Sequence, residues 1–149
     1  LKTGMKVSVA TPKDYKPSEI VLDFAKDYDC FTLTEDIYEA ARGADVILTD
    51  VWASMGEEAQ IPERVRLLSP FRVTEETLKA TENPDVLYLH CLPSFHDFET
   101  KMAKEWHDKG VDIREVTDEV FRSRHSAVFD EAENRMHSIK AIMVATIGK

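Results

Sequence analysis

Short apolar runs alternate along this chain with longer stretches in which apolar residues recur every three or four positions. The short runs predict β-strands at residues 5–10, 30–33, 46–49, 86–89 and 113–116. The third run closes the string ADVILT at residues 44–49, which is almost wholly apolar, as expected for a strand covered on both faces.

The longer stretches predict helices, with Ser18, Thr34 and Thr74 as N-cap residues. The expected helical ranges are 18–28, 34–42, 62–69, 74–80, 98–109, 117–121 and 130–147. Strands that alternate with helices are typical of an α/β fold, in which a parallel sheet carries helices on both faces. Residues 1–4 (LKTG) look like the end of a helix with a glycine cap, which suggests that the chain starts inside a larger βα unit.

Composition narrows the possible functions. A chain of 149 residues fits one domain, and its net charge of −9 argues against nucleic acid as the main partner. The sequence contains no apolar run of membrane-spanning length, and residues 1–4 do not read as part of a signal peptide, so neither a membrane span nor a signal peptide is expected. Cys30 and Cys91 form no disulfide framework or metal-binding pattern, so a cytoplasmic protein without a metal is expected. Without a GxGxxG or P-loop string, a nucleotide site has no sequence support.

Candidate chemistry collects where two predicted strands end. Asp50 follows one strand, and His90 and Cys91 end the next strand along the chain. Because the carboxyl ends of parallel strands share one edge, these side chains are expected to face one crevice. An acid and a thiol there could orient an amine and manage its protons. The alternative is that Cys91 is a small buried apolar residue and His90 a hydrogen-bonded core histidine.

Two further stretches carry unusual residues. Residues 50–60 form a long connection in which Trp52 and Met55 are expected to be exposed beside Ser54, although both could simply pack on the core. Residues 129–137 place three acids in the first turn of a helix, where the helix dipole favours them. Arg135 in that helix could equally be an ordinary solvated side chain.

Taken together, these strings resemble the ornithine carbamoyltransferases. The matching strings are TDVWASMG at 49–56, LHCLP at 89–93, EVTDEVF at 115–121 and FDEAENRMH at 129–137. They occur in the family's order over essentially the whole chain. Aspartate carbamoyltransferases carry proline at the position of Cys91, and putrescine carbamoyltransferases lack the Ser-Met-Gly triplet. The resemblance therefore favours L-ornithine as the amine substrate.

The resemblance implies a role for each matching residue. Asp50 binds the amino groups of ornithine, while Ser54 and Met55 hold its amino-acid end. Cys91 lies beside the reacting δ-amine as proton acceptor. The backbone of Cys91 and Leu92 receives the carbamoyl amide, and Arg135 supplies positive charge near the carbamoyl group of carbamoyl phosphate. Neither a cofactor nor a metal is implied.

The resemblance also implies how the chain is organised. Residues 1–149 correspond to a Rossmann-like, ornithine-binding second domain that lacks its first strand and helix. Residues 130–147 correspond to a helix that packs on a carbamoyl-phosphate domain, whose Ser-Thr-Arg-Thr and His-Pro-x-Gln strings do not occur here. The intact parent is expected to be an enzyme, a homotrimer or a multiple of trimers, that forms citrulline in arginine synthesis or breakdown. The isolated chain is expected to be inactive. The alternative to the carbamoyltransferase function is that the chain is an inactive fragment, or a non-enzymatic module that binds an amino acid or takes part in assembly.

Overall fold

The computed structural model describes residues 1–54 and 56–148. It contains four strands, which pair in parallel as two separate two-stranded sheets. In the first sheet β1 (Val7–Ala10) pairs with β2 (Phe31–Thr34), and in the second β3 (Val46–Thr49) pairs with β4 (Leu87–His90). The expected parallel pairing of the 46–49 and 86–89 runs is confirmed, and the chain has an α/β fold with helices flanking parallel strands.

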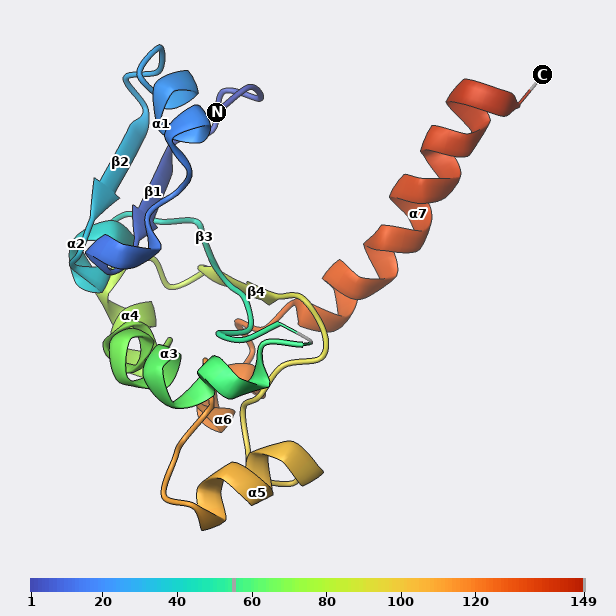
Figure 1. The fold of residues 1–149 in the computed structure, drawn as a ribbon. Helices are drawn as coiled ribbons and strands as arrows, with labels where there is room; N and C mark the ends of the chain where they lie inside the picture. Colours follow the sequence, from blue (N-terminus) through green and yellow to red (C-terminus); the bar gives the residue numbers. More distant parts are fainter. Residues whose placement is uncertain (55, 149) are drawn as a thin grey trace.

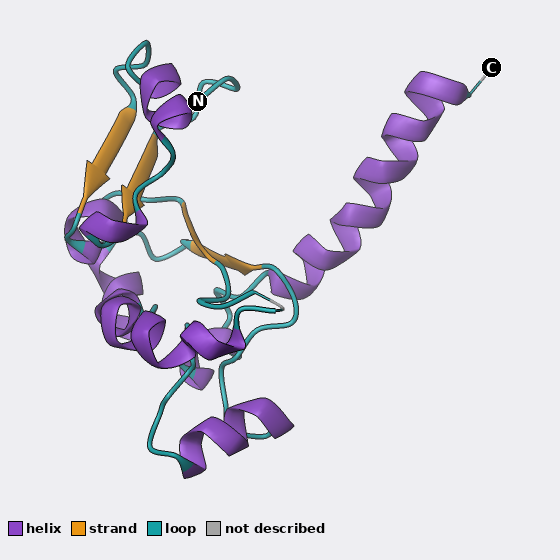
Figure 2. Cartoon of the chain, viewed as in Figure 1, coloured by secondary structure: helices purple, strands orange, loops and turns teal. Residues whose placement is uncertain are grey.

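The predicted single sheet is instead interrupted between β1 and β3, which leaves β1 with β2 in one sheet and β3 with β4 in another (Figure 2). A groove of about 550 Å³ separates the pairs and is lined by both strands and by α2 (Ile37–Ala41). In a parallel strand, the backbone amides of every second residue donate hydrogen bonds to the neighbouring strand on the same side. Val7 and Thr11 donate to β2 and its flank, so the amides of Ser8 and Ala10 are directed toward the groove. The edges of β1 and β3 that face the groove could therefore pair with a further extended segment.

The helices lie close to their expected positions. They are α1 (Glu19–Ala25), α2, α3 (Ile61–Leu68), α4 (Glu75–Ala80), α5 (Lys101–Asp108), α6 (Asp118–Phe121) and α7 (Val128–Ile147), with 3-10 turns at Lys13–Tyr15, Glu58–Gln60 and Ser69–Phe71. Thr74 begins α4 with a capping box, as predicted. The predicted cap of α2 was wrong: Thr34 ends β2, and Asp36 accepts the amides of Tyr38 and Glu39 instead.

The strand predicted at residues 113–116 is also wrong. Of these residues only Val116 takes part in β-pairing, through an isolated parallel bridge to Val73. The Arg72 guanidinium donates to the carbonyls of Asp112 and Arg114, at 3.2 and 2.7 Å. The Arg72 side chain thus bonds to carbonyl oxygens that would otherwise accept hydrogen bonds from a neighbouring strand. Residues 113–116 therefore do not form a full strand.

Two apolar clusters hold the chain together. The larger one joins β4 to the segments around it and contains buried residues from α4, β4, α6 and the start of α7, namely Leu78, Val86, Tyr88, Val116, Val120, Phe121 and Val128 with Val73. The smaller cluster packs Ile61 of α3 against Ala103 of α5 and Ile113. β4 is the strand within the larger cluster. The residues that follow β4 therefore begin from a well-packed position.

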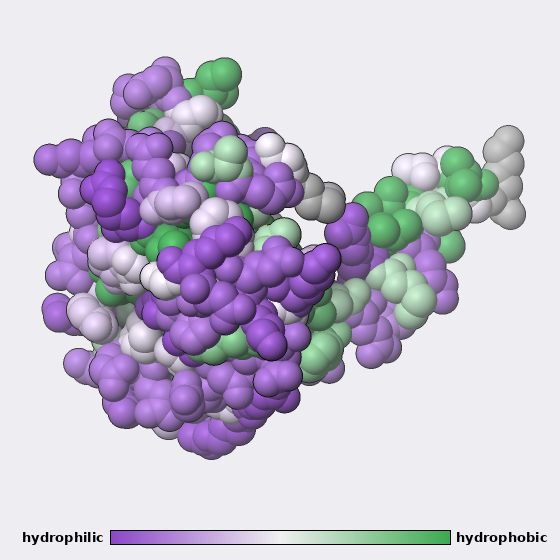
Figure 3. All heavy atoms as spheres, turned by 60° about the horizontal axis from the view of Figure 1, so that its bottom comes forward, coloured by the Kyte–Doolittle hydropathy of each residue, from purple (hydrophilic) through white to green (hydrophobic). Residues whose placement is uncertain are grey.

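The last helix stands apart from this core. Figure 1 shows α7 projecting from the end of β4 as a single long rod, and Figure 3 shows apolar residues along it. Six apolar side chains of α7 beyond its second turn are exposed: Met136, Ile139, Ile142, Met143, Val144 and Ile147. The outer part of α7 therefore presents apolar side chains that no other described part of the chain covers. Within the described residues, no helix is both long enough and apolar enough to cross a membrane.

Candidate active site

The register of β3 and β4 brings the predicted acid and thiol together. Thr49 pairs with His90, so the next residues of the two strands, Asp50 and Cys91, emerge side by side at one edge. The Cys91 Sγ–H donates to Asp50 Oδ1 at 2.8 Å. The expectation that these side chains face the same place is confirmed by this contact.

The local environment keeps the thiol protonated. Burial, the hydrogen bond to Asp50 and the negative charge of Asp50 raise the pKa of Cys91 to about 11. Asp50 Oδ1 also accepts the amide of Val51 at 2.7 Å. Among the described residues, Asp50 Oδ2 has no hydrogen-bond partner, so this oxygen is available to a cationic ligand.

His90 lies on the other face of β4 from Cys91. Side chains alternate along a strand, and both Tyr88 and His90 are fully buried while Cys91 is exposed. The core interpretation is therefore wrong for Cys91. For His90 it is correct as to burial, but only one ring nitrogen is hydrogen-bonded, since Nε2 has no partner among the described residues. His90 Nδ1 bonds the carbonyl of Cys91, which makes Nδ1 the protonated nitrogen of a neutral ring. Burial lowers the pKa of His90.

A buried carboxyl group lies behind His90. Glu115 is fully buried, and its Oε2 is 3.9 Å from His90 Nε2. Oε2 accepts the amide of Phe95 at 2.8 Å, while the Glu115 amide donates to the Phe95 carbonyl at 3.1 Å. Burial raises the pKa of Glu115 to about 8, so its carboxyl group is neutral below that pH. Glu115 thereby fixes the far end of the segment that carries Cys91, Leu92 and the cis Leu92–Pro93 bond.

The loop after Asp50 packs more closely than expected. Trp52 is only 8% exposed, so the core alternative is correct for this residue. Arg64 of α3 holds the loop by donating to the Trp52 carbonyl at 2.9 Å and by pairing with Glu57 at 2.7 Å. Ser54 is exposed, and its amide donates to Glu57 Oε2. Met55 lies outside the described residues.

The predicted carbamoyl-phosphate groups are less closely assembled. Leu92 is 41% exposed beside Cys91. Arg135 lies on α7, one turn beyond Glu131, and is exposed. Within residues 1–54 and 56–148, its guanidinium makes no hydrogen bond or ion pair. The structure therefore leaves the Arg135 cation available without bringing it into contact with Asp50 or Cys91.

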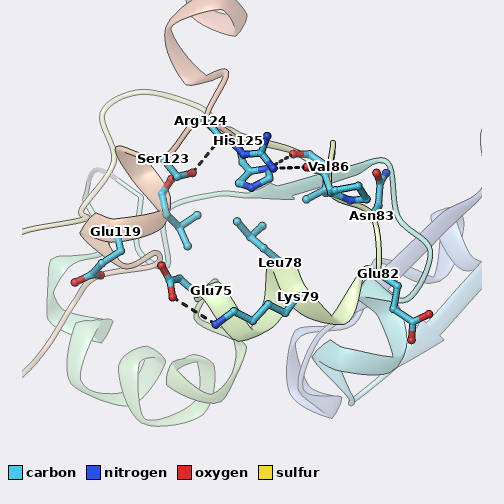
Figure 4. A pocket seen from close by; sticks show the side chains of 12 residues that line it. Glu75, Leu78, Lys79, Glu82, Asn83, Val86, Glu119, Ser123, Arg124 and His125 are labelled. Carbon is cyan, nitrogen blue, oxygen red and sulfur yellow. Dashed lines mark hydrogen bonds and ion pairs between the residues drawn. The ribbon is translucent and has the colours of Figure 1, made fainter.

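Two other features were considered as sites. A groove of about 420 Å³ lies between α4, α6 and residues 82–86. Figure 4 shows the side chains that line it. Its cations already have partners: Lys79 pairs with Glu75, and Arg124 donates to the Pro84 carbonyl. This groove therefore offers little chemistry for a reaction, and it contains neither Asp50 nor Cys91.

The second feature is a cluster of three possible metal ligands. His96, Asp97 and Asp118 bring their ligating atoms within 4.8 Å of one another. Arg122 pairs with both carboxylates, and His96 Nδ1 bonds Asp118 at 2.6 Å. The charges are thus compensated within the protein, which favours an ion-pair network over a metal site.

A model of one protein family covers nearly the whole chain. The Asp/Orn binding domain of aspartate/ornithine carbamoyltransferases matches residues 1–146. The chain belongs to this family. Asp50 and Cys91 are therefore neighbours at the strand ends of a carbamoyltransferase amino-acid-binding domain.

Individual relatives agree with this carbamoyltransferase assignment. A catabolic ornithine carbamoyltransferase of Bacillus cereus is 54% identical over 147 residues, which are 97% of this chain and 44% of the relative. An ornithine carbamoyltransferase of Clostridium perfringens is 52% identical over 155 residues, which cover 99% of this chain and 47% of the relative. The ornithine carbamoyltransferase structure from Pyrococcus furiosus superposes with a TM-score of 0.79 at 39% identity, and the match covers 99% of this chain and 43% of that one. The chain thus spans under half the length of the curated relatives it matches.

Two residues that the structure places beside the site of this carbamoyltransferase domain had no role predicted from the sequence. Glu115 fixes Phe95, and Glu131 Oε2 accepts the His90 amide at 3.0 Å. Both lie within the strings that suggested the family, but each was one acid among several. Burial of Glu115 and the contact of Glu131 depend on tertiary packing, which residue spacing does not reveal.

Proposed function

We propose that this chain is the ornithine-binding part of an ornithine carbamoyltransferase, which transfers the carbamoyl group of carbamoyl phosphate to the δ-amine of L-ornithine. The products are citrulline and phosphate. The contact between Cys91 and Asp50 at adjacent strand ends carries this proposal, because an acid beside a thiol is the pair of groups that binding and deprotonating an amine requires. Relatives named ornithine carbamoyltransferase, at 52–54% identity, support ornithine as the amine.

The reaction first requires an unprotonated amine. The δ-ammonium group of ornithine binds at the open oxygen of Asp50, Oδ2, while Oδ1 keeps the Cys91 thiol and the Val51 amide. With a pKa raised to about 11, the free-state thiol is not itself a ready proton acceptor. A bound ammonium group would lower that pKa by supplying a positive charge. Asp50 and Cys91 therefore act as a pair that accepts and passes on the proton.

The amine nitrogen then attacks the carbonyl carbon of carbamoyl phosphate. A nitrogen–carbon bond forms, an oxyanion develops, and the carbon–oxygen bond to phosphate breaks. The leaving phosphate carries away one of the two protons that the ammonium group loses. Donors must lie where the oxyanion develops, and Arg135 together with the backbone at Cys91 and Leu92 would supply them. Ser54 and Met55 would hold the amino-acid end of ornithine, and positioning two substrates together contributes much of the rate.

A complete enzyme needs more than these residues. Carbamoyl phosphate carries a dianionic phosphate, which requires a dedicated anion site. Arg135 is one cation, and the chain has a net charge of −9. The groove between β1 and β3 and the exposed face of α7 support packing against a carbamoyl-phosphate-binding part. We propose that the whole protein is a cytoplasmic homotrimer or a multiple of trimers.

A chimera tests the proposed activity. The 147-residue region of the Bacillus cereus relative that matches this chain would be replaced by the chain itself, and citrulline would be measured colorimetrically with both substrates present. The chimera is expected to form citrulline, whereas the isolated chain is not. Cys91→Ala should lower turnover more than it changes carbamoyl-phosphate affinity, and Asp50→Asn should weaken ornithine binding. Cys30→Ala is the matched control, since Cys30 lies away from Asp50 at the start of β2.

Two outcomes would contradict the proposal. A folded chimera that carbamoylates aspartate or putrescine in preference to ornithine would show that the amine was assigned wrongly. A folded chimera that binds ornithine without forming citrulline would favour the alternative, a non-enzymatic amino-acid-binding or assembly module. Turnover by the isolated chain near that of the chimera would require a phosphate site within residues 1–149.

A further inference from the structure

The outer edge of β4 is paired with the segment that leads into α7. The Tyr88 amide donates to the His125 carbonyl at 2.7 Å, and the Ala127 amide donates to the Tyr88 carbonyl at 2.9 Å. These bonds form a parallel bridge between Tyr88 and Ser126. In a parallel ladder the next donor is the His90 amide, and its regular acceptor is the carbonyl of Ala127.

That carbonyl is not available, because the backbone turns into a helix at this point. The Ala127 carbonyl accepts the amide of Glu131 at 2.9 Å, in the first turn of α7. The His90 amide donates instead to Glu131 Oε2 at 3.0 Å. The carboxylate of Glu131 therefore takes the place of the missing ladder carbonyl at the last residue of β4.

This replacement occurs one residue before the Cys91 thiol. Cys91 follows His90 directly, and its thiol donates to Asp50. The titratable groups that act on the Cys91 thiol are Asp50 after β3 and Glu131 in α7, and the thiol in turn acts on Tyr88 of β4. His90 contacts only the backbone carbonyl of Cys91. Burial and Asp50 are the main causes of the raised pKa of Cys91, and the negative charge of Glu131 adds to them.

We infer that Glu131 is a positioning residue that holds the end of β4 and thereby sets the place of the Cys91 thiol relative to Asp50. It does so from α7, whose outer part exposes an apolar face. The consequence for catalysis rests on the proposed function, whereas the positioning of Cys91 does not.

The positioning is tested on the 149-residue chain in a Cys30→Ser background, which leaves Cys91 as the single thiol. Glu131→Gln keeps a side-chain oxygen that can accept the His90 amide but removes the charge, and Glu131→Ala removes both. Glu133→Ala and Glu133→Gln are matched controls, because Glu133 lies on the same helix and pairs with His137. Amide hydrogen exchange at His90 and the pH profile of Cys91 alkylation by iodoacetamide are measured for each.

Glu131→Ala should accelerate exchange of the His90 amide by about tenfold or more, because a charge-assisted hydrogen bond is lost, and Glu131→Gln should change it much less. Both variants should lower the midpoint pH of Cys91 alkylation by a few tenths of a unit, and the Glu133 variants should leave both readouts unchanged. Unchanged exchange in Glu131→Ala, or an equal effect of Glu133→Ala, would overturn the inference. If circular dichroism shows Glu131→Ala to be unfolded, Glu131→Gln decides, because a neutral amide oxygen accepts a hydrogen bond more weakly than a carboxylate. Exchange of the His90 amide at the same rate in Glu131→Gln as in the unmodified chain would then overturn the inference.

The catalytic consequence is measured in the chimera. Glu131→Ala should lower kcat about tenfold or more and leave the KM for carbamoyl phosphate nearly unchanged, with partial rescue in Glu131→Gln. An unchanged kcat would remove the link to catalysis. If the chimera forms no citrulline at all, the proposed function fails, but hydrogen exchange and alkylation still decide the positioning role.

Discussion

The buried pair of His90 and Glu115 should make the stability of the chain depend on pH in a defined direction. The pKa of Glu115 is raised to about 8 from a reference of 4.5, chiefly by burial. A carboxyl group that holds its proton more tightly when folded stabilises the chain at low pH. That stability is lost progressively as the pH rises from about 4.5 to about 8.

His90 acts in the opposite direction. Burial lowers its pKa below the reference of 6.5, so the folded chain resists its protonation and stability falls as the pH drops below 6.5. Between pH 4.5 and 6.5 the two dependences oppose each other. Above pH 6.5 only Glu115 remains, and over the roughly 1.5 units up to pH 8 the chain should lose about 2 kcal/mol, at about 1.4 kcal/mol per unit.

Glu115→Gln isolates this effect, because the amide oxygen can still accept the Phe95 amide while the titrating group is gone. Between pH 5 and 8 the variant should gain about 4 kcal/mol in free energy of unfolding relative to the unmodified chain. Urea denaturation followed by circular dichroism at pH 5, 6.5 and 8 measures this difference. Glu119→Gln, an exposed acid in α6, is the control. A difference between Glu115→Gln and the unmodified chain that stays constant across this range would refute the reasoning.

Further measurements test other contacts. Asp50→Asn should lower the pKa of Cys91 from about 11 toward its ordinary value, because it replaces the negatively charged acceptor of the thiol proton with a neutral one, and the pH profile of thiol alkylation measures this. Tyr88→Phe should be neutral or stabilising in urea denaturation, since the buried Tyr88 hydroxyl has no partner among the described residues. Trp52→Ala should destabilise the chain by about 3–5 kcal/mol, because a buried aromatic ring leaves a cavity, and thermal unfolding checks this value.

Hydrophobic pattern predicted the strands and helices well where local sequence decides the structure. The runs that became β3 and β4 are apolar and lie between turn residues, and both formed parallel strands. The strand predicted at residues 113–116 was wrong, because the Arg72 guanidinium donates to the carbonyls of Asp112 and Arg114. Arg72 is 40 or more residues away from them in the sequence, so the local pattern does not contain this contact. It also could not show that β1 and β3 would be separated by a groove, since pairing between strands is a tertiary property.

The candidate site shows the same division between local and tertiary information. Asp50 and Cys91 could be paired from sequence, because each ends a strand and parallel strands share an edge. Whether His90 or Cys91 faces that edge could not be known, because a one-residue change of register exchanges the two faces of a strand. The register of Thr49 with His90 settles it, leaving Cys91 exposed and His90 buried against Glu115.

Carboxyl groups on both sides of the Cys91 thiol therefore hold it in different ways. Asp50 accepts the thiol proton directly, whereas Glu131 holds the backbone one residue earlier and Glu115 holds Phe95 four residues later. This loop, held at both ends, sets the Cys91 Sγ at 2.8 Å from Asp50 Oδ1. Under the proposed function, an entering amine would meet the Asp50 carboxylate already in place, so its binding energy would not be spent on ordering that group.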